Sequence, residues 1–214
     1  KYSNHAIRAV REGLWAVVFD QRYMGTAGQN EAGAPACLKT NMAAMATMLG
    51  RTAIGERVWD ISRAIDVLKE FEHLGLDLDK ILITGNSGGG TISFYAAAYD
   101  ERIKFSAPSC AFCSYLTSIL NVPHCSCNYI PGILDWFEME DLAGLIAPRP
   151  FTVIAGQGDK IFPIEGVRDS YKVVEEIYKA AGAPDACRMV ETPMPHWWCK
   201  DIVWDAILDR TAKM

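Results

Sequence analysis

A serine in a glycine-rich turn is the residue whose surroundings point most directly to chemistry. The stretch Gly85-Asn86-Ser87-Gly88-Gly89 matches the pattern G-x-S-x-G. Residues 80–84 are apolar and β-branched, as in a strand, and residues 90–99 are rich in small residues that favour a helix. In this setting the pattern forms a nucleophile elbow, a strained turn that projects the serine hydroxyl. Gly85 and Gly89 are expected to let strand and helix approach closely. The alternative is an ordinary glycine-rich turn with an idle serine.

A serine hydroxyl attacks a carbonyl only when a base removes its proton, and an imidazole base needs a carboxylate to orient it. Asp159 follows a predicted strand at 151–155, and His196 follows another at 188–191. The carboxyl ends of parallel strands lie at one edge of a sheet, so these side chains are expected to meet Ser87 there. The sequence therefore predicts Ser87 as nucleophile, His196 as base and Asp159 as the orienting acid.

Other residues compete for these roles. His196 adjoins two tryptophans and is also compatible with simple aromatic packing, and Asp159 with capping a turn toward Lys160. The remaining histidines lie in helix-like or inserted segments. The rival carboxylates lie in a predicted insertion rather than after a core strand. These rivals are His5, His73, His124, Asp135, Glu138, Glu140 and Asp141.

Further contacts to the reacting group are predicted with weaker support. The Gly88 N–H lies at a predicted helix N-terminus, where the helix dipole favours a developing oxyanion. Arg22, after an apolar run, and the aromatic residues Trp136 and Trp197 are candidates for substrate binding. For Arg22 a structural ion pair is the favoured alternative, and for each aromatic ring plain packing against the core is favoured.

Strand-like and helix-like segments alternate along the chain, which predicts an α/β fold with a doubly wound, mostly parallel sheet. We expect a single domain over residues 1–214, a glycine-containing loop at 21–35 and an insertion at about 109–147 over the sheet. The expected strands are 15–19, 80–84, 103–107, 151–155 and 188–191, and the expected helices are 38–49, 56–72, 90–99, 165–181 and 201–210.

The overall composition excludes several classes of partner. The net charge is −5, so no nucleic acid is expected as a ligand. No apolar run reaches the length of about 18 residues that a membrane span needs. We expect a small-molecule or oligosaccharide ester as substrate and no cofactor. Association of the chain into a homo-oligomer stays open.

The chain has seven cysteines, four of which lie between residues 110 and 127. Cys110, Cys113, Cys125 and Cys127, with His124, resemble a zinc set, but the C-x-C half departs from the usual C-x-x-C spacing. A domain of this size needs no disulfides, so reduced thiols and no metal are expected. This favours a cytoplasmic location, although the sequence leaves the compartment open.

The elbow and the order Ser87, Asp159, His196 resemble the α/β-hydrolase superfamily. Two further segments, 125–134 and 141–150, resemble bacterial acetyl-xylan-esterase-like and dienelactone-hydrolase-like members. The resemblance extends from about Trp15 over most of the chain. It implies an α/β-hydrolase-type sheet and a metal-free serine carboxylic-ester hydrolase, with short-chain (acetyl) esters of carbohydrates as the expected substrates.

The chain departs from this family at its start. A full α/β-hydrolase has more strands before 15–19, and the loop that supplies the second oxyanion donor would lie upstream of Lys1. We therefore expect a sheet without its N-terminal strands, in which strand 15–19 lies near an exposed edge or under a partner subunit. Two other functions stay open: a serine peptidase of the prolyl-oligopeptidase type, and a truncated, non-catalytic binding protein.

Overall fold

The structure, a computed structural model, describes residues 5–24 and 42–212. Their contacts group into two compact units: the described residues up to Leu76 with Cys125–Cys127, and Asp77–His124 with the described chain from Asn128 onward. The single-domain organisation stays an expectation from the sequence. Most of the predicted loop at 21–35, as well as Cys37, lies outside the described residues.

The first unit is helical in its described part. It contains α1 (His5–Arg11), α3 (Met42–Met48), α4 (Ala53–Leu68) and a 3-10 helix, η2 (Lys69–Leu74). Helix α4 begins where the side chain of Thr52 accepts a hydrogen bond from the Gly55 N–H. Gly75 adopts the left-handed backbone conformation that ends η2.

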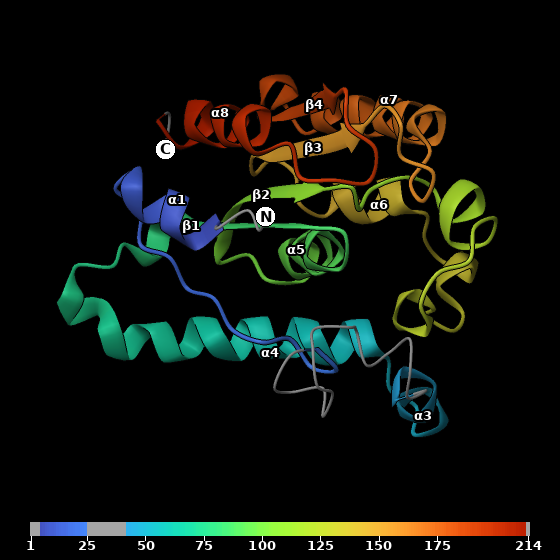
Figure 1. The fold of residues 1–214 in the computed structure, drawn as a ribbon, viewed down its shortest axis with the longest axis horizontal. Coiled ribbons are helices and arrows are strands. Elements are labelled where there is room, and N and C mark those ends of the chain that lie inside the picture. The colour runs from blue at the N-terminus through green and yellow to red at the C-terminus, as the bar shows by residue number, and fades with distance from the viewer. Residues whose placement is uncertain (1–4, 25–41, 213–214) are drawn as a thin grey trace. The chain divides into compact units, whose positions relative to one another are not determined.

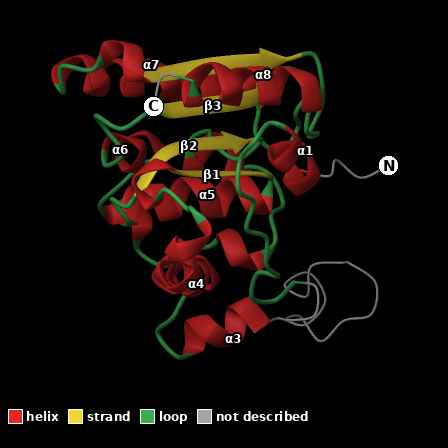
Figure 2. Ribbon diagram, turned by 90° about the vertical axis from the view of Figure 1, so that its left-hand side faces the viewer, coloured by secondary structure: helices red, strands yellow, loops and turns green. Residues whose placement is uncertain are grey.

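The second unit is built on a parallel sheet of four strands in the order β1-β2-β3-β4. The strands are β1 (Ile81–Asn86), β2 (Ile103–Ser109), β3 (Phe151–Gly156) and β4 (Cys187–Thr192). Every neighbouring pair is parallel, so all four strands end at the same edge, as Figure 2 shows. This arrangement confirms the predicted α/β class and places the loops after β1, β3 and β4 beside one another.

Helices α5 (Gly88–Tyr99) and α7 (Ile164–Ala180) connect neighbouring strands in the same direction across the sheet. Right-handed crossovers of this kind put their helices on one face. Helix α6 (Met139–Gly144) contacts both of them, and the last helix, α8 (Lys200–Thr211), packs on β3 and β4 (Figure 1). Three buried rings form one core: Phe94 of α5, Phe112 in the segment that follows β2, and Phe151 of β3. No described helix has the length and apolar character that crossing a membrane requires.

The segment predicted as an insertion contains short helices rather than irregular coil. Besides α6, it contains a π-helix, η4 (Tyr115–Ile119), and two 3-10 helices, η5 (Ser126–Asn128) and η6 (Ile133–Asp135). Further 3-10 turns, η3 (Leu78–Lys80) and η7 (Pro184–Ala186), precede β1 and β4. Helix α6 begins with a capping box formed by Glu138 and Asp141. Two of the rival carboxylates therefore have structural roles at a helix start.

The predicted strand at 15–19 is wrong. These residues have no regular secondary structure, and within the described chain no strand pairs with them. Val18 is 74% exposed and Trp15 is 61% exposed. The apolar sequence satisfies the side-chain preferences of a strand, but a strand also needs a neighbour to accept and donate its backbone hydrogen bonds. Because residues 15–19 form no strand, the prediction that this strand lies near an exposed edge or under a partner subunit is wrong as well.

A single arginine joins several elements of the second unit. The guanidinium of Arg149 donates to the carbonyl oxygens of Ala97, Asp100, Ile103 and Leu145, at 2.7 to 3.2 Å. Burial lowers the pKa of this guanidinium. The four carbonyls lie near the ends of α5 and α6 and at the start of β2, so one side chain joins these elements and satisfies helix-end carbonyls that have no partner within their own helix.

We predict that Arg149→Met lowers the free energy of unfolding by on the order of 3 kcal/mol, because it leaves several carbonyl oxygens without their hydrogen-bond donor. Chemical denaturation followed by circular dichroism measures this change. The matched control is Lys172→Met, which removes an exposed ion pair to Asp169 and should cost less than about 0.5 kcal/mol. Equal effects of the two substitutions would contradict the role given to Arg149.

Candidate active site

Ser87 occupies a strained turn between β1 and α5. Its φ is +54° and its ψ is −121°, a region that L-residues other than glycine seldom adopt. The Ser87 N–H donates to the Ser109 carbonyl at the end of β2, at 2.9 Å. The Ser109 hydroxyl in turn donates to the Asn86 side chain at 3.0 Å. The ends of two neighbouring strands therefore hold the serine in this conformation.

The close approach of strand and helix depends on two glycines, one of which the sequence prediction missed. A Cβ on Gly85 would lie 2.5 Å from the Gly89 carbonyl carbon. A Cβ on Gly90 would lie 2.6 Å from the Ser109 carbonyl oxygen. A Cβ on Gly89 would meet no described atom within 4 Å, so the role predicted for Gly89 belongs to Gly90. The G-x-S-x-G pattern ends one residue before the glycine whose lack of a side chain matters.

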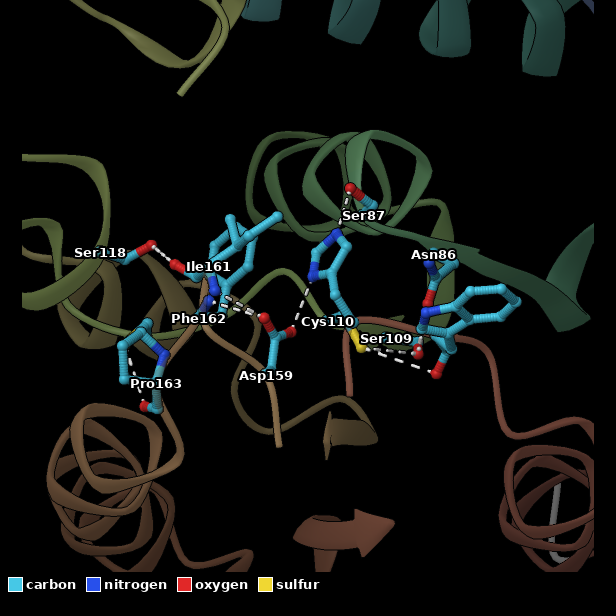
Figure 3. Close-up of polar contacts among 12 residues, drawn as sticks. Asn86, Ser87, Ser109, Cys110, Ser118, Asp159, Ile161, Phe162 and Pro163 are labelled. Carbon is cyan, nitrogen blue, oxygen red and sulfur yellow. Dashed lines mark hydrogen bonds and ion pairs between the residues drawn. The ribbon is translucent and has the colours of Figure 1, made fainter. Parts of the chain in front are cut away.

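The structure brings Ser87, His196 and Asp159 together in one hydrogen-bonded series (Figure 3). His196 Nε2 lies 2.7 Å from the Ser87 hydroxyl oxygen, and Nδ1 lies 2.7 Å from Asp159 Oδ2. Because an ionised carboxylate only accepts, Nδ1 carries the proton and donates it to Asp159. Nε2 is then free to accept the hydroxyl hydrogen of Ser87, which is the arrangement that a general base requires.

The Asp159 carboxylate is buried, and both of its oxygens accept hydrogen bonds. Burial by itself raises its pKa, but hydrogen bonds from His196 and from the N–H groups of Phe162 and Ile161 outweigh this, so the pKa lies below its usual value. The two backbone N–H groups reach Oδ1 at 3.1 and 2.8 Å. Asp159 therefore stays ionised near neutral pH and keeps the Nδ1–H tautomer of His196 in place.

A support behind the acid was not foreseen from the sequence. The Ser118 hydroxyl donates to the Ile161 carbonyl at 2.7 Å, and His124 Nε2 lies 3.1 Å from the same hydroxyl. The Phe162 ring stacks on the His196 imidazole, with ring centres 5.9 Å apart, and His124 packs edge-on against Phe162. Burial lowers the pKa of His124. No sequence motif marks these residues, because their contacts arise only from the folded insertion.

The loops that carry acid and base are tied to each other. The Gln157 N–H donates to the Thr192 carbonyl at 2.9 Å, and the Gly158 N–H donates to the Met194 carbonyl at 3.1 Å. Gly156 lies so close to the base loop that an added Cβ would be 2.4 Å from the Pro195 carbonyl oxygen. These contacts fix the position of His196 relative to Asp159.

Two further residues of the second unit adjoin these three: Gly88, the predicted oxyanion donor, and Cys110, for which no part in the ester chemistry was predicted. The Gly88 N–H begins α5, so it belongs to the first turn, where helix N–H groups have no partner within the helix. Cys110 follows β2, is 2% exposed and adopts a φ of +50°. Burial raises the pKa of its thiol to about 11, so the thiol is protonated at neutral pH.

The weaker substrate-binding candidates have different surroundings. Arg22, in the first unit, makes a two-pronged ion pair with Asp60 at 2.7 and 2.8 Å. Trp136 and Trp197 are exposed by 78% and 66%.

The cysteines differ in part from expectation. Cys110, Cys113, Cys187 and Cys199 are free thiols. Cys125 and Cys127 form a disulfide, so the prediction of reduced thiols is wrong for this pair. The two residues lie at the turn of η5 with Cα atoms 5.4 Å apart, which is within the range that a disulfide spans.

We predict that Gly156→Ala lowers kcat for the ester hydrolysis expected from the sequence on the order of 100-fold, because the new methyl group displaces the loop that carries His196 and a displacement of about 1 Å is enough for such a loss. Gly158→Ala is the matched control, since its Cβ would lie 3.5 Å from Pro195 Cα, an ordinary contact. Steady-state kinetics of both variants measures the difference. Similar kcat values for the two would contradict this account of how His196 is positioned.

Comparisons with known proteins agree with the fold. The model of the family described as "Glucuronyl esterase, fungi" matches residues 10–112, a stretch that includes the Ser87 elbow but neither Asp159 nor His196. A Bacillus subtilis (strain 168) protein described as "Putative hydrolase YtaP" is 29% identical over 153 residues, which are 70% of this chain and 50% of that protein.

Two solved structures share this fold at low identity. A structure from Bacteroides fragilis, described as "a putative acetyl xylan esterase", has a TM-score of 0.69 and 21% identity, over 87% of this chain and 49% of that one. A glucuronoyl esterase from Caldicellulosiruptor kristjansonii has a TM-score of 0.60 and 18% identity, over 74% of this chain and 48% of that one. The chain spans about half the length of these relatives. Its resemblance to esterases of the α/β-hydrolase type is thereby confirmed.

Proposed function

We propose that this protein is a serine carboxylic-ester hydrolase that acts on esters of carbohydrates. The observation that carries the proposal is the unbroken series Ser87–His196–Asp159, with both connecting distances at 2.7 Å. Each of the three residues follows a different strand of one parallel sheet. The likeness to carbohydrate esterases supports an ester substrate rather than a peptide.

The first half of the reaction acylates the serine. The Ser87 oxygen attacks the ester carbonyl while His196 Nε2 takes the hydroxyl proton. The imidazolium that forms is stabilised by the buried Asp159 carboxylate, which remains ionised. The Gly88 N–H, at the positive end of α5, is placed to donate to the oxyanion of the tetrahedral intermediate. His196 then gives its proton to the leaving alcohol as the carbon–oxygen bond breaks.

The second half releases the acid. A water molecule takes the place of the alcohol, and His196 removes its proton as it attacks the acyl group on Ser87. Collapse of the second tetrahedral intermediate returns the proton to the Ser87 oxygen and frees the carboxylic acid. The stacked Phe162 ring keeps the imidazole in one plane through both halves.

An exposed aromatic side chain next to the base favours a substrate that combines a ring with a small acyl group. Trp197, next to the base, is largely exposed. Flat apolar faces suit a sugar or aryl ring better than a long flexible acyl chain. Acetyl esters of carbohydrates are therefore our first candidate.

Esters of glucuronic acid are a second candidate, favoured by the match of residues 10–112 to the glucuronyl esterase family. In an acetylated sugar the carbohydrate is the leaving alcohol, whereas in a glucuronate ester it supplies the acyl group. The two substrates would therefore leave different acyl groups on Ser87, which distinguishes them chemically.

We predict hydrolysis of short-chain p-nitrophenyl esters with the highest kcat/KM at acetate, together with acetate release from acetylated xylan oligomers. The panel also contains methyl glucuronate and a proline amide substrate. Turnover of methyl glucuronate in place of acetylated xylan would select the second candidate. A maximum at octanoate or longer, with neither carbohydrate ester cleaved, would contradict both.

Variants of the series serve as controls in the same assay. Ser87→Ala and His196→Ala should each remove most of the activity, and the double variant should lose little more, because the two residues act as one unit. Proline amide cleavage without ester cleavage would favour the peptidase alternative. An unchanged rate in Ser87→Ala would overturn the proposed mechanism.

A further inference from the structure

The thiol of Cys110 has no part in the mechanism described above, yet it lies among the residues that carry it. Its sulfur lies 3.8 Å from the Ser109 hydroxyl oxygen and 3.9 Å from the Trp197 carbonyl oxygen, and Figure 3 shows the thiol between Ser109 and the Asp159 carboxylate. Its backbone N–H donates to the Ile154 carbonyl of β3 at 2.9 Å, which fixes the residue at the sheet edge. The Cys110 thiol is thus held beside Asp159 and His196.

Three potential metal-ligand atoms meet at this point. One donor atom each of Cys110, Asp159 and His196 lies within 4.8 Å of the other two. Cys110 and Asp159 are buried, and the three residues come from the loops after β2, β3 and β4. Thiolate, carboxylate and imidazole are the ligands that Zn²⁺ takes in proteins, at about 2.0–2.3 Å from the metal. In a tetrahedral site such ligands lie roughly 3.5 Å apart, so small side-chain movements would close the set.

We propose that Cys110, Asp159 and His196 form a binding site for Zn²⁺ that switches the candidate active site off. Zn²⁺ bonds to Cys110 Sγ, to an Asp159 carboxylate oxygen and to His196 Nδ1, and a water molecule fills the fourth position. The thiol proton leaves to solvent, and the proton of Nδ1 moves to Nε2, so the imidazole that binds the metal stays neutral. The metal replaces the hydrogen bond between Nδ1 and Asp159, and no atom is oxidised or reduced.

Occupancy of this site is incompatible with the base function of His196. The metal holds Nδ1 and the Asp159 carboxylate, so the imidazole can no longer become the carboxylate-stabilised cation that proton transfer from Ser87 requires. Because the Cys110 thiol is protonated at neutral pH, metal binding displaces a proton, and the affinity should rise with pH. The proposed Zn²⁺ is therefore an inhibitor, whereas the mechanism described above needs neither a structural nor a catalytic metal.

The donor set also predicts which cations are excluded. Mg²⁺ and Ca²⁺ take oxygen ligands, of which the cluster offers a single carboxylate. Soft or borderline cations such as Zn²⁺ and Co²⁺ accept sulfur and nitrogen. Inhibition by Zn²⁺ but not by Mg²⁺ at the same concentration is therefore part of the proposal.

The binding step can be measured without any ester hydrolysis. We would titrate the Ser87→Ala variant with Co²⁺ and record its absorption spectrum. We expect thiolate-to-metal charge-transfer absorption and the visible bands of a tetrahedral site, saturating at one equivalent and lost when Zn²⁺ is added. Adding Cys110→Ser or Cys110→Ala should remove the charge-transfer absorption. Adding Cys199→Ser, which changes a free thiol outside the cluster, should leave it.

The inhibition step uses the chain with Ser87 intact. Each variant's rate with Zn²⁺ is divided by its own rate without metal. Replacing Cys110 should weaken Zn²⁺ inhibition more than about tenfold, since removing even an outer partner of a metal site costs that much. Zn²⁺ inhibition or a Co²⁺ thiolate spectrum that survives both Cys110 substitutions would overturn the proposal. A normal Co²⁺ result with no ester hydrolysis would leave the metal site standing and refute the esterase function alone.

Discussion

The close approach of β1 and α5 at Ser87 is the constraint on which the candidate site depends. The serine adopts a positive φ, a conformation that costs on the order of 1–3 kcal/mol for a residue with a side chain. It persists because the Ser109 carbonyl accepts the Ser87 N–H and because Gly85 and Gly90 add no side chain to the contact. Any substitution that widens this turn would move the hydroxyl away from His196.

The electrostatics of the site rest on a balance at Asp159. Taking a carboxylate out of water is costly, and here two backbone N–H groups and the His196 N–H compensate for it. The loop that supplies those N–H groups is in turn held from behind by Ser118 and His124. The segment that the sequence predicted as an insertion thus supports the loop that carries Asp159.

Much of the fold could be predicted from local sequence. The strands β1 to β4 and the helices α5, α7 and α8 follow from apolar runs and helical spacing, because these elements bury their apolar faces within one unit. The run at 15–19 has the same composition but no strand partner among the described residues, and partner strands cannot be recognised from one segment alone. The π-helix at Tyr115–Ile119 and the disulfide of Cys125 and Cys127 likewise leave no periodic signal in the sequence.

The placement of Ser87, Asp159 and His196 was predictable because each follows a strand of a parallel sheet, and topology alone brings such positions to one edge. The residues that refine the site were not predictable in this way. Gly90, Gly156, Ser118 and Phe162 act through close backbone approach or through contacts between distant segments. Such contacts depend on distances of a few tenths of an ångström, which the spacing of residue types does not encode.

Labelling with a fluorophosphonate, followed by mass spectrometry of the peptides, tests the central claim most directly. The reagent reacts with serine hydroxyls that a base has activated. Our account predicts one adduct per chain, on Ser87, and its loss in His196→Ala even though the serine remains. An unlabelled chain, or an adduct that forms equally well without His196, would contradict the claim that this hydrogen-bonded series makes Ser87 a nucleophile.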